Sequence, residues 1–304
     1  MEAEALFLGV LNIDMVLEAS DQIIGNKIMG SKVSTHAGGY GTTQSIGCAR
    51  SGVSSAVIGK IGNDAFGSDI ISTLDSEGID RCCVEILDGE KTGLSTIIVR
   101  SHAENMYLDF LGANFKMEAC SVEQRLHDIQ QCKFLGAHIG VATVEPSLAL
   151  MKIADAFGIP IVVNFSTVDL PENLFFTQPD YIVLSYATAS MLCGFAVNNL
   201  KGARIASTLL LPYAKKAVIF QMDCAGVMVS TPESCDVVDV DPTQTIVDPS
   251  GMSDFFLGVF VAQMIKGNDL LESVSRAHKA AMYCGSRVGV YESFPSREFL
   301  QWGT

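Results

Sequence analysis

The residues with the clearest chemical potential lie at the start of an apolar helix near the end of the chain. Residues 248–254 read Asp-Pro-Ser-Gly-Met-Ser-Asp, and an apolar helix is expected over Phe255–Ile265. Ser250 is a plausible N-cap. The free N–H groups that follow it predict an anion site for a phosphoryl group, formed by Gly251, Met252 and Ser253. Asp254 could accept a proton from an attacking hydroxyl, or it could only complement the helix dipole.

A second pair of polar residues follows the first apolar run. Ala5–Leu11 predicts a buried strand, with Asn12 and Asp14 at its carboxyl end. In open α/β sheets, ligands bind outside the carboxyl ends of the strands, and residues two apart face the same side. An amide and a carboxylate in this place predict a site that binds the two hydroxyl groups of a diol. An ordinary strand-ending turn is the alternative.

A glycine-rich motif, His-Ala-Gly-Gly-Tyr-Gly-Thr-Thr-Gln, spans residues 36–44 and precedes a predicted helix. Its glycines, Gly38, Gly39 and Gly41, would let the backbone approach a ligand closely. The motif does not fit a dinucleotide fingerprint, because the third glycine would fall at Gln44, and the chain contains no G-K-[ST] phosphate loop. A glycine-rich turn without a ligand is the alternative.

Strand-like and helix-like segments alternate along the chain. Further strand-like runs are Ser55–Ile58, Lys133–Leu135, Ile161–Val163, Tyr181–Leu184, Ala217–Gln221 and Val227–Val229. Helical periodicity occurs at Thr43–Ser51, Ala65–Glu77, Pro146–Phe157 and Lys201–Ala214. This alternation predicts an α/β fold with a mostly parallel sheet covered on both faces. A chain of 304 residues in this class is expected to form one domain, residues 1–304.

Two segments interrupt the alternation. Residues 13–37 have no helical pattern, and residues 92–112 read as a hairpin with arms Gly93–Val99 and Met106–Phe110. The two segments could pair into a small β lid that closes over a ligand and excludes water, as a group-transfer enzyme requires. An ordinary surface hairpin is the alternative.

Charge and composition limit the classes of partner. The formal net charge of −14 disfavours nucleic acid and anionic membranes. Phe255–Ile265 is too short to span a bilayer, and the start of the chain lacks the positive region of a signal peptide. Nine cysteines occur without any C-x-x-C pair, which argues against a disulfide framework or a zinc site. These features favour a cytoplasmic protein.

Taken together, the three motifs resemble the ribokinase-like (PfkB) carbohydrate kinase family over almost the whole chain. The resemblance rests on Gly-x-x-Asn-x-Asp at residues 9–14, Gly-Gly-x-Gly at 38–41, the run Ile58–Gly67, the helix start that ends in Asp254, and Gly289-x-x-x-Ser293. This family phosphorylates hydroxyls of sugars and nucleosides from ATP. The fold it implies is a three-layer α/β/α sandwich with a central, mostly parallel sheet and a small β lid.

The resemblance also implies roles for individual residues. Asp254 would be the catalytic base, and the backbone of Gly251, Met252 and Ser253 would form the anion hole. The substrate site would be formed by Asn12, Asp14, Gly38, Gly39, Gly41 and Thr43. The nucleotide site would include Ser185, Asp223, Gly226 and His278. The cofactor would be ATP with Mg²⁺, K⁺ could bind at Asp248, Ser250, Gly289 and Ser293, and a homodimer could form through the lid.

Several positions depart from the family pattern and mark a divergent member. Tyr40 stands where ribokinases usually have lysine, and Thr43 where the family usually has asparagine. The Asn-x-x-Glu motif expected after Leu184 is replaced by residues 185–188, Ser-Tyr-Ala-Thr, which carry no carboxylate. Ser253 replaces a glycine that gives the phosphoryl group room, and Asp223 places negative charge near the phosphates.

These features leave three hypotheses of different classes. The leading one is an ATP-dependent kinase for a sugar or nucleoside hydroxyl, with Tyr40 and Met106 favouring a nucleoside. The second is a pseudokinase that binds such a molecule with little or no phosphoryl transfer. The third, a nicotinamide-dependent oxidoreductase, is disfavoured by the absent third glycine. The sequence leaves the acceptor unidentified.

Overall fold

A computed structural model describes residues 2–301 except for 25–26, 101–102, 167–176, 240, 242 and 244. Within the described residues, the strands make one sheet of nine strands and one of four. The large sheet runs in the order β13 (Cys235–Val238), β12 (Val227–Ser230), β11 (Ala217–Gln221), β10 (Tyr181–Leu184), β9 (Ile161–Phe165), β8 (Phe134–Ile139), β1 (Ala5–Leu8), β4 (Ser55–Gly62) and β5 (Val84–Leu87).

The large sheet is parallel from β5 to β11, and β12 and β13 are added antiparallel at one edge. Its central strands are continuous apolar runs, such as Ala-Leu-Phe-Leu in β1, and every residue of β1 is buried. Strands of this composition are typical of a parallel sheet that is covered on both faces.

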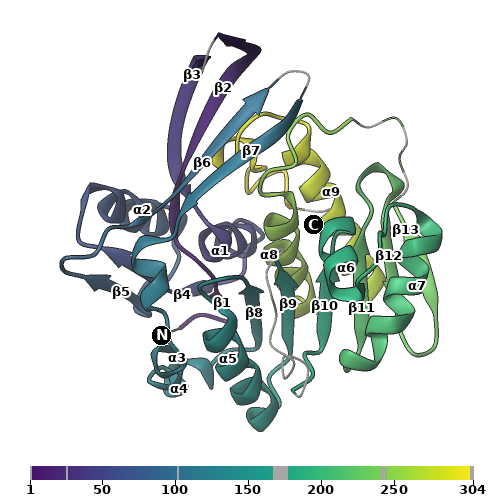
Figure 1. Ribbon diagram of the computed structural model, residues 1–304. Coiled ribbons are helices and arrows are strands. Elements are labelled where there is room, and N and C mark those ends of the chain that lie inside the picture. The colour runs from purple at the N-terminus through teal and green to yellow at the C-terminus, as the bar shows by residue number, and fades with distance from the viewer. Residues whose placement is uncertain are drawn as a thin grey trace.

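Two layers of helices cover this sheet (Figure 1). One apolar core joins it to α1 (Tyr40–Arg50), α2 (Ala65–Glu77), α8 (Met252–Ile265) and α9 (Leu270–Gly285). A second core on the other face joins it to α3 (Ala119–Glu123), α4 (Leu126–Ile129), α5 (Val144–Phe157), α6 (Tyr186–Cys193) and α7 (Leu200–Leu210). Short 3-10 helices are η1 (Gly112–Lys116), η3 (Leu211–Tyr213), η4 (Asp223–Ala225) and η5 (Tyr291–Ser293). The predicted three-layer sandwich is confirmed.

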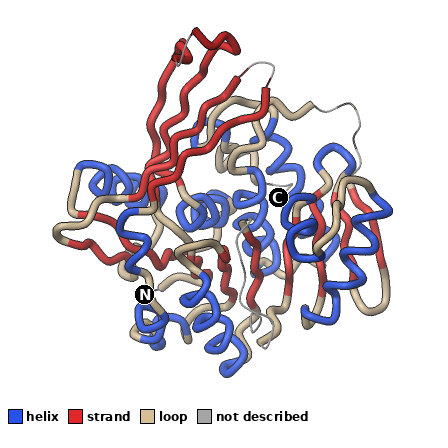
Figure 2. The backbone as a smooth tube through the Cα atoms, in the orientation of Figure 1, coloured by secondary structure: helices blue, strands red, loops and turns tan. Residues whose placement is uncertain are grey.

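The four-stranded sheet, here named the lid sheet, has the order β3 (Lys27–Gly38), β2 (Asn12–Ile24), β6 (Gly93–Arg100) and β7 (Ala103–Phe110). It projects from the body of the molecule (Figure 2). β2 pairs parallel with β6, so the two interrupting segments of the sequence pair side by side as expected. Side chains alternate across the sheet: Ser95 and Ile97 are buried, whereas Met106, Leu108 and Phe110 are exposed on the other face.

Several predicted boundaries differ from those in the structure, for example that of the strand predicted over 133–135, which is β8, and the three that follow. The first strand ends at Leu8, so Asn12 and Asp14 lie at the start of β2 and not at the carboxyl end of β1. α1 begins at Tyr40, not Thr43, so most of the glycine motif belongs to its N-terminus. α7 ends at Leu210, because Pro212 cannot continue an α-helix and the chain tightens into η3. Within the described residues, no helix is long and apolar enough to cross a bilayer.

Candidate functional site

Two cavities meet at the N-terminus of α8. The first has a volume of about 330 Å³ and the second about 310 Å³, and Pro249 and Ser253 line both. The first lies between the lid sheet, α1 and α8, and the second between the N-termini of α6 and α8, the end of β11 and the middle of α9. The two cavities are therefore adjacent, and the start of α8 separates them.

Asp254, in the first turn of α8, is buried in the wall of the first cavity. Its Oδ1 accepts hydrogen bonds from Nε2 of Gln44 at 2.9 Å and from Nδ2 of Asn164 at 3.0 Å. Gln44 comes from α1 and Asn164 from β9, so two elements distant in sequence fix the carboxylate. Because both amides donate to Oδ1, they orient the carboxylate without occupying Oδ2.

Burial raises the pKa of Asp254 to about 6, and the hydrogen bonds from Asn164 and Gln44 limit the rise. A carboxylate with this pKa is a stronger base than an ordinary aspartate and is still ionised at neutral pH. These are the properties that a general base toward a hydroxyl requires.

His138, at the end of β8, contacts Asn164 and so extends this hydrogen-bond network. Its Nδ1 lies 3.1 Å from Oδ1 of Asn164, and that amide oxygen can only accept, so Nδ1 carries the proton. Burial lowers the pKa of His138 to about 3, which keeps the ring neutral. The 3.7 Å approach of His138 to Asp254 is therefore not an ion pair. The ring of Tyr40 stacks on His138 with centroids 3.4 Å apart and forms part of the cavity wall.

Asn12 and Asp14 face the same cavity from the start of β2. Oδ1 of Asn12 accepts from Nδ2 of Asn114 at 2.9 Å, which fixes the amide. Gly38 on the paired strand lies so close that a Cβ there would overlap the carboxylate of Asp14. Burial, followed by the negative charge of Asp109, raises the pKa of Asp14 to about 7, and the N–H of Gly39 opposes this rise.

The lid sheet contributes polar residues that were not predicted from the sequence. Asp14 of β2 is opposite Ser95 of β6, and Ser95 is opposite Asp109 of β7. Oγ of Ser95 donates to Oδ1 of Asp109 at 2.6 Å. Ser95, Asp109 and Tyr107 all line the first cavity. The only signal in the sequence was the two-residue spacing of Tyr107 and Asp109, which places them on one face of a strand.

The start of α8 differs from the prediction in two respects. Its N-cap is Gly251, with φ 77°, and not Ser250, because this left-handed conformation suits glycine. The hydroxyl of Ser250 instead lies 3.1 Å from that of Tyr107 on the lid sheet. The N–H of Met252 donates to the carbonyl oxygen of Pro249 at 3.3 Å. Among the described residues, the N–H groups of Gly251 and Ser253 have no protein acceptor, so they are the donors that remain for an anion.

The side chain of Ser253 contacts the end of β11. Its hydroxyl donates to Oε1 of Gln221, at the end of β11, at 2.7 Å. Gln221 and Ser253 thus form one wall of the second cavity. Ser253 therefore adds a hydrogen-bonded hydroxyl to the wall that the two cavities share.

The second cavity gathers most of the predicted nucleotide residues. Ser185, Asp223 and His278 line it, whereas Gly226 does not and instead closes the turn after η4. Ser185 is the N-cap of α6 and exchanges hydrogen bonds with Thr188, so both hydroxyls cap the helix. Burial raises the pKa of Asp223 and lowers the pKa of His278.

Of the four residues predicted for a monovalent cation, Ser250 and Gly289 contact the carboxylate of Asp248 through their backbone N–H groups. Oδ1 accepts from the N–H of Ser250 at 3.0 Å and from Nδ2 of Asn105 at 3.1 Å. Oδ2 accepts from the N–H of Gly289 at 3.0 Å. The hydroxyl of Ser293 donates to the carbonyl oxygen of Val290 at 2.6 Å and does not contact Asp248. Potassium binding stays a prediction.

The first cavity thus contains most of the predicted substrate residues and several that were missed. Gly38 and Gly41 lie behind its wall and do not line it, and Met106 faces away on the exposed side of the lid sheet. The missed residues of the network are Gln44, His138 and Asn164. The sequence did contain a signal for His138 and Asn164, because each is a polar residue that closely follows a predicted apolar strand.

Comparisons with known proteins agree with this arrangement. The model for the pfkB family of carbohydrate kinases matches residues 3–297. A ribokinase of Haemophilus influenzae is 26% identical over 299 residues, which are 97% of this chain and 97% of the relative. A deoxyribokinase of Salmonella typhi is 23% identical over 262 residues, 86% of this chain and 85% of the relative. The structure of Arabidopsis thaliana ribokinase complexed with ribose and ATP aligns over 100% of both chains, with a TM-score of 0.86 and 20% identity. The resemblance inferred from the motifs is confirmed.

Proposed function

Because the chain belongs to the pfkB family of carbohydrate kinases, and is therefore a phosphotransferase with an alcohol acceptor, we propose that it transfers the γ-phosphoryl group of ATP to a hydroxyl of a sugar or nucleoside. The observation that carries this proposal is the position of Asp254, which faces the first cavity at the wall shared with the second. The acceptor occupies the first cavity and ATP the second, so the two reactants meet at the start of α8.

In this reaction the acceptor oxygen forms a bond to the γ-phosphorus while the bond between that phosphorus and the β–γ bridging oxygen breaks. The acceptor proton goes to Asp254, whose orientation by Gln44 and Asn164 supports a role as general base. The N–H groups of Gly251 and Ser253 stabilise the negative charge that develops on the transferred group. ADP is the leaving group.

Magnesium is expected to enter with ATP. The second cavity offers oxygen donors in Asp223, Gln221 and Ser185, a set that fits a hydrated Mg²⁺ bound mainly through phosphates and water. The ion would neutralise charge on the phosphates. Asp223, held close to the cavity by a left-handed backbone with φ 52°, would then be attracted to the metal instead of repelling ATP.

The charge of the first cavity defines the class of acceptor. Asp14, Asp109 and Asp254 line it, and among the described residues no lysine or arginine does. An acceptor with its own negative charge would face these three acidic groups, of which Asp14 and Asp254 are buried and Asp109 is exposed. We therefore expect a neutral or cationic polyol. Tyr40 still favours a flat, nucleoside-like ligand, whereas Met106 lies outside the cavity and no longer supports that choice.

The test measures ATP binding first, because it requires no knowledge of the acceptor. Calorimetric titration of the purified chain with ATP, with and without Mg²⁺, should show micromolar to sub-millimolar binding that is tighter with the metal. A panel of sugars and nucleosides, including ribose and deoxyribose, is then assayed for ADP release. Acceptor binding without any ADP release would favour the pseudokinase. A chain that binds neither ATP nor any acceptor would contradict both hypotheses.

Dimerisation through the lid sheet is part of the same proposal. Met106, Leu108 and Phe110 form an exposed apolar row on β7, which is an edge strand of that sheet. Covering this row in a second copy would remove apolar area from water. Sedimentation of the wild type and of Leu108→Asp tests it: a dimer that becomes a monomer supports the contact, and a wild-type monomer contradicts it.

A further inference from the structure

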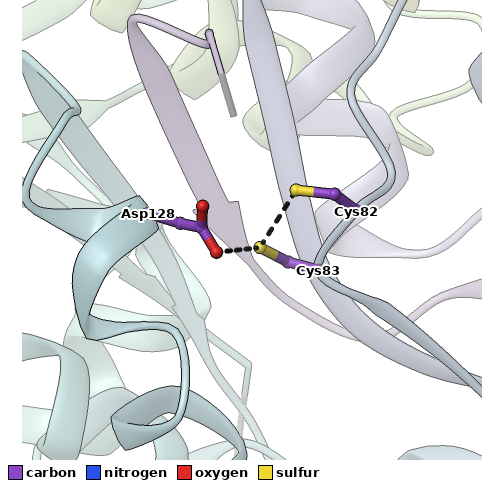
Figure 3. A group of neighbouring side chains, drawn as sticks. All are labelled: Cys82, Cys83 and Asp128. Carbon is purple, nitrogen blue, oxygen red and sulfur yellow. Dashed lines mark hydrogen bonds between the residues drawn. The ribbon is translucent and has the colours of Figure 1, made fainter.

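A cluster of metal-binding side chains lies away from both cavities. Cys82 and Cys83 occupy the turn before β5, and Asp128 lies on α4 (Figure 3). The two sulfur atoms are 3.7 Å apart, and Sγ of Cys83 is 3.8 Å from Oδ2 of Asp128. Among the described residues, this is the one group in which three or more such ligand atoms lie within 4.8 Å of one another.

Two of the three separations are close to those of ligands around one tetrahedral ion, and the third is within 4.8 Å. With Zn–S bonds of about 2.3 Å and a Zn–O bond of about 2.0 Å, tetrahedral geometry places two sulfur ligands about 3.8 Å apart. The same geometry places a sulfur and an oxygen ligand about 3.5 Å apart. The observed 3.7 and 3.8 Å need only small side-chain movements to reach these values.

We propose that Cys82, Cys83 and Asp128 bind one thiophilic divalent ion of the Zn²⁺ type, with water as the fourth ligand. Two sulfur donors and one carboxylate favour zinc over magnesium or calcium, which prefer oxygen donors. Cys82 is exposed, which gives the ion a path from solvent, whereas Cys83 is buried at 4% exposure and supplies a fixed ligand.

This site is not visible as a pattern in the sequence. The cysteines are adjacent and not in a C-x-x-C pair, and the third ligand follows Cys83 by 45 residues. The expectation that the cysteines form no zinc site depended on sequence spacing, whereas the fold brings α4 against the turn before β5. The bound ion would link these two segments of the chain.

Proton release gives the proposal a specific signature. A cysteine thiol is mostly protonated at neutral pH, whereas a metal ion binds the thiolate. Binding therefore exchanges two S–H protons for one M²⁺ ion, forming two metal–sulfur bonds and releasing two protons to the buffer. The affinity should rise by up to about a hundredfold per pH unit below the thiol pKa values.

The experiment uses the reduced full-length chain titrated with Co²⁺, whose absorption reports thiolate ligation and tetrahedral geometry. The expected result is one Co²⁺ per chain with a thiolate-to-metal charge-transfer band, displaced by Zn²⁺. Calorimetry in buffers of different ionisation enthalpy should give about two protons released per ion. Zinc should also raise the Tm of the wild type, because it binds the folded state.

Single substitutions of the proposed ligands test which residues bind the ion. Cys82→Ser changes an exposed side chain and should abolish the band, and Asp128→Asn should weaken binding at least tenfold. Cys235→Ser is the control, because Cys235 is also exposed but begins β13 at the opposite edge of the large sheet. Three outcomes would overturn the proposal: a wild type that binds no Co²⁺ at micromolar concentration, a Cys82→Ser variant that binds as the wild type does, or equal loss in Cys235→Ser.

Discussion

The two cavities at the start of α8 differ in how much of their chemistry is fixed before a ligand arrives. The first contains three carboxylates, and two of them have pKa values raised to about 7 and about 6 by burial. The second contains one carboxylate, Asp223, and a buried His278 whose pKa is lowered. The first cavity therefore holds buried carboxyl groups that are costly to ionise, whereas the second is lined mainly by backbone groups and neutral side chains.

The two cavities therefore favour their ligands through different interactions. A polyol that donates a hydrogen bond to Asp14 would relieve the cost of keeping this group charged in a buried site. A triphosphate in the second cavity finds no lysine or arginine among the described lining residues, so its charge must be met by N–H groups and by the metal that arrives with it. The predictions below test this contrast, in order of decreasing effect.

The largest effect is expected from removing the base. Asp254→Asn keeps the size of the side chain and abolishes its ability to accept a proton, so kcat should fall roughly 10²–10⁴-fold. Acceptor and ATP binding, measured by calorimetry, should change little. Asp69→Asn, at an exposed position on α2, is the control. A kcat within a factor of two of the wild type would remove Asp254 from the proposed mechanism.

A charged acceptor tests the electrostatics of the first cavity directly. Phosphorylated or carboxylated analogues of the best neutral acceptor should have kcat/KM lower by about 10² or more, because like charges placed together in a buried site cost several kcal/mol. Asp109→Asn should narrow this discrimination, since it removes one of the three charges. An anionic analogue accepted as well as its neutral parent would show that the carboxylates do not select by charge.

The buried carboxyl group of Asp14 should lower the stability of the folded protein and strengthen acceptor binding. Its pKa rises from 3.8 to about 7 on folding, so stability falls by up to about 4 kcal/mol as the pH rises from about 4 to about 7, where only the unfolded state has lost the proton. Asp14→Asn should therefore have a higher Tm than the wild type at pH 8 and nearly the same Tm near pH 4, while its acceptor KM rises at least tenfold. Calorimetric unfolding at the two pH values measures it. Equal Tm differences at both would contradict the buried charge.

The fold and one part of the site could be predicted from the sequence, and the reason lies in what each depends on. The α/β sandwich follows from local periodicity, and the helix start at 251–254 is a contiguous motif. The network around Asp254 is different, because Gln44, His138 and Asn164 come from three separate elements and only the packed sheet brings them together. Likewise, Asp109 lines the first cavity because of strand register, which the sequence of β7 alone does not specify.

The pH dependence of kcat/KM should depend on the amide side chains that donate hydrogen bonds to Asp254. The base must be ionised, so kcat/KM should fall tenfold per pH unit below about 6. Gln44→Leu removes a hydrogen bond that lowers this pKa, so its acid limb should move to higher pH by up to about one unit. The other amide atom of Gln44, Oε1, has no partner among the described residues, so the hydrogen bonds that the change removes are those from Nε2 to Asp254 and Asn164. If the acid limb of the kcat/KM profile stayed at the same pH in Gln44→Leu, a group other than Asp254 would be responsible for it.

The smallest expected effect concerns the contact between the lid sheet and the start of α8. The hydroxyl of Tyr107 lies 3.1 Å from that of Ser250, and Nδ2 of Asn105 donates to Asp248 at 3.1 Å. Tyr107→Phe removes one of these two hydrogen bonds and keeps the ring in the cavity wall. Because a hydrogen bond of this kind contributes about 0.5–1.5 kcal/mol, we expect the KM for the acceptor to rise about two- to tenfold.

The KM for ATP should stay unchanged in Tyr107→Phe, because Tyr107 does not line the second cavity. Tyr213→Phe, on exposed η3, controls for loss of a tyrosine hydroxyl in general. Steady-state kinetics with each substrate varied in turn separates the two constants. If both KM values rose together, the lid sheet would act on the nucleotide as well, and the two cavities would be one coupled site and not two adjacent ones.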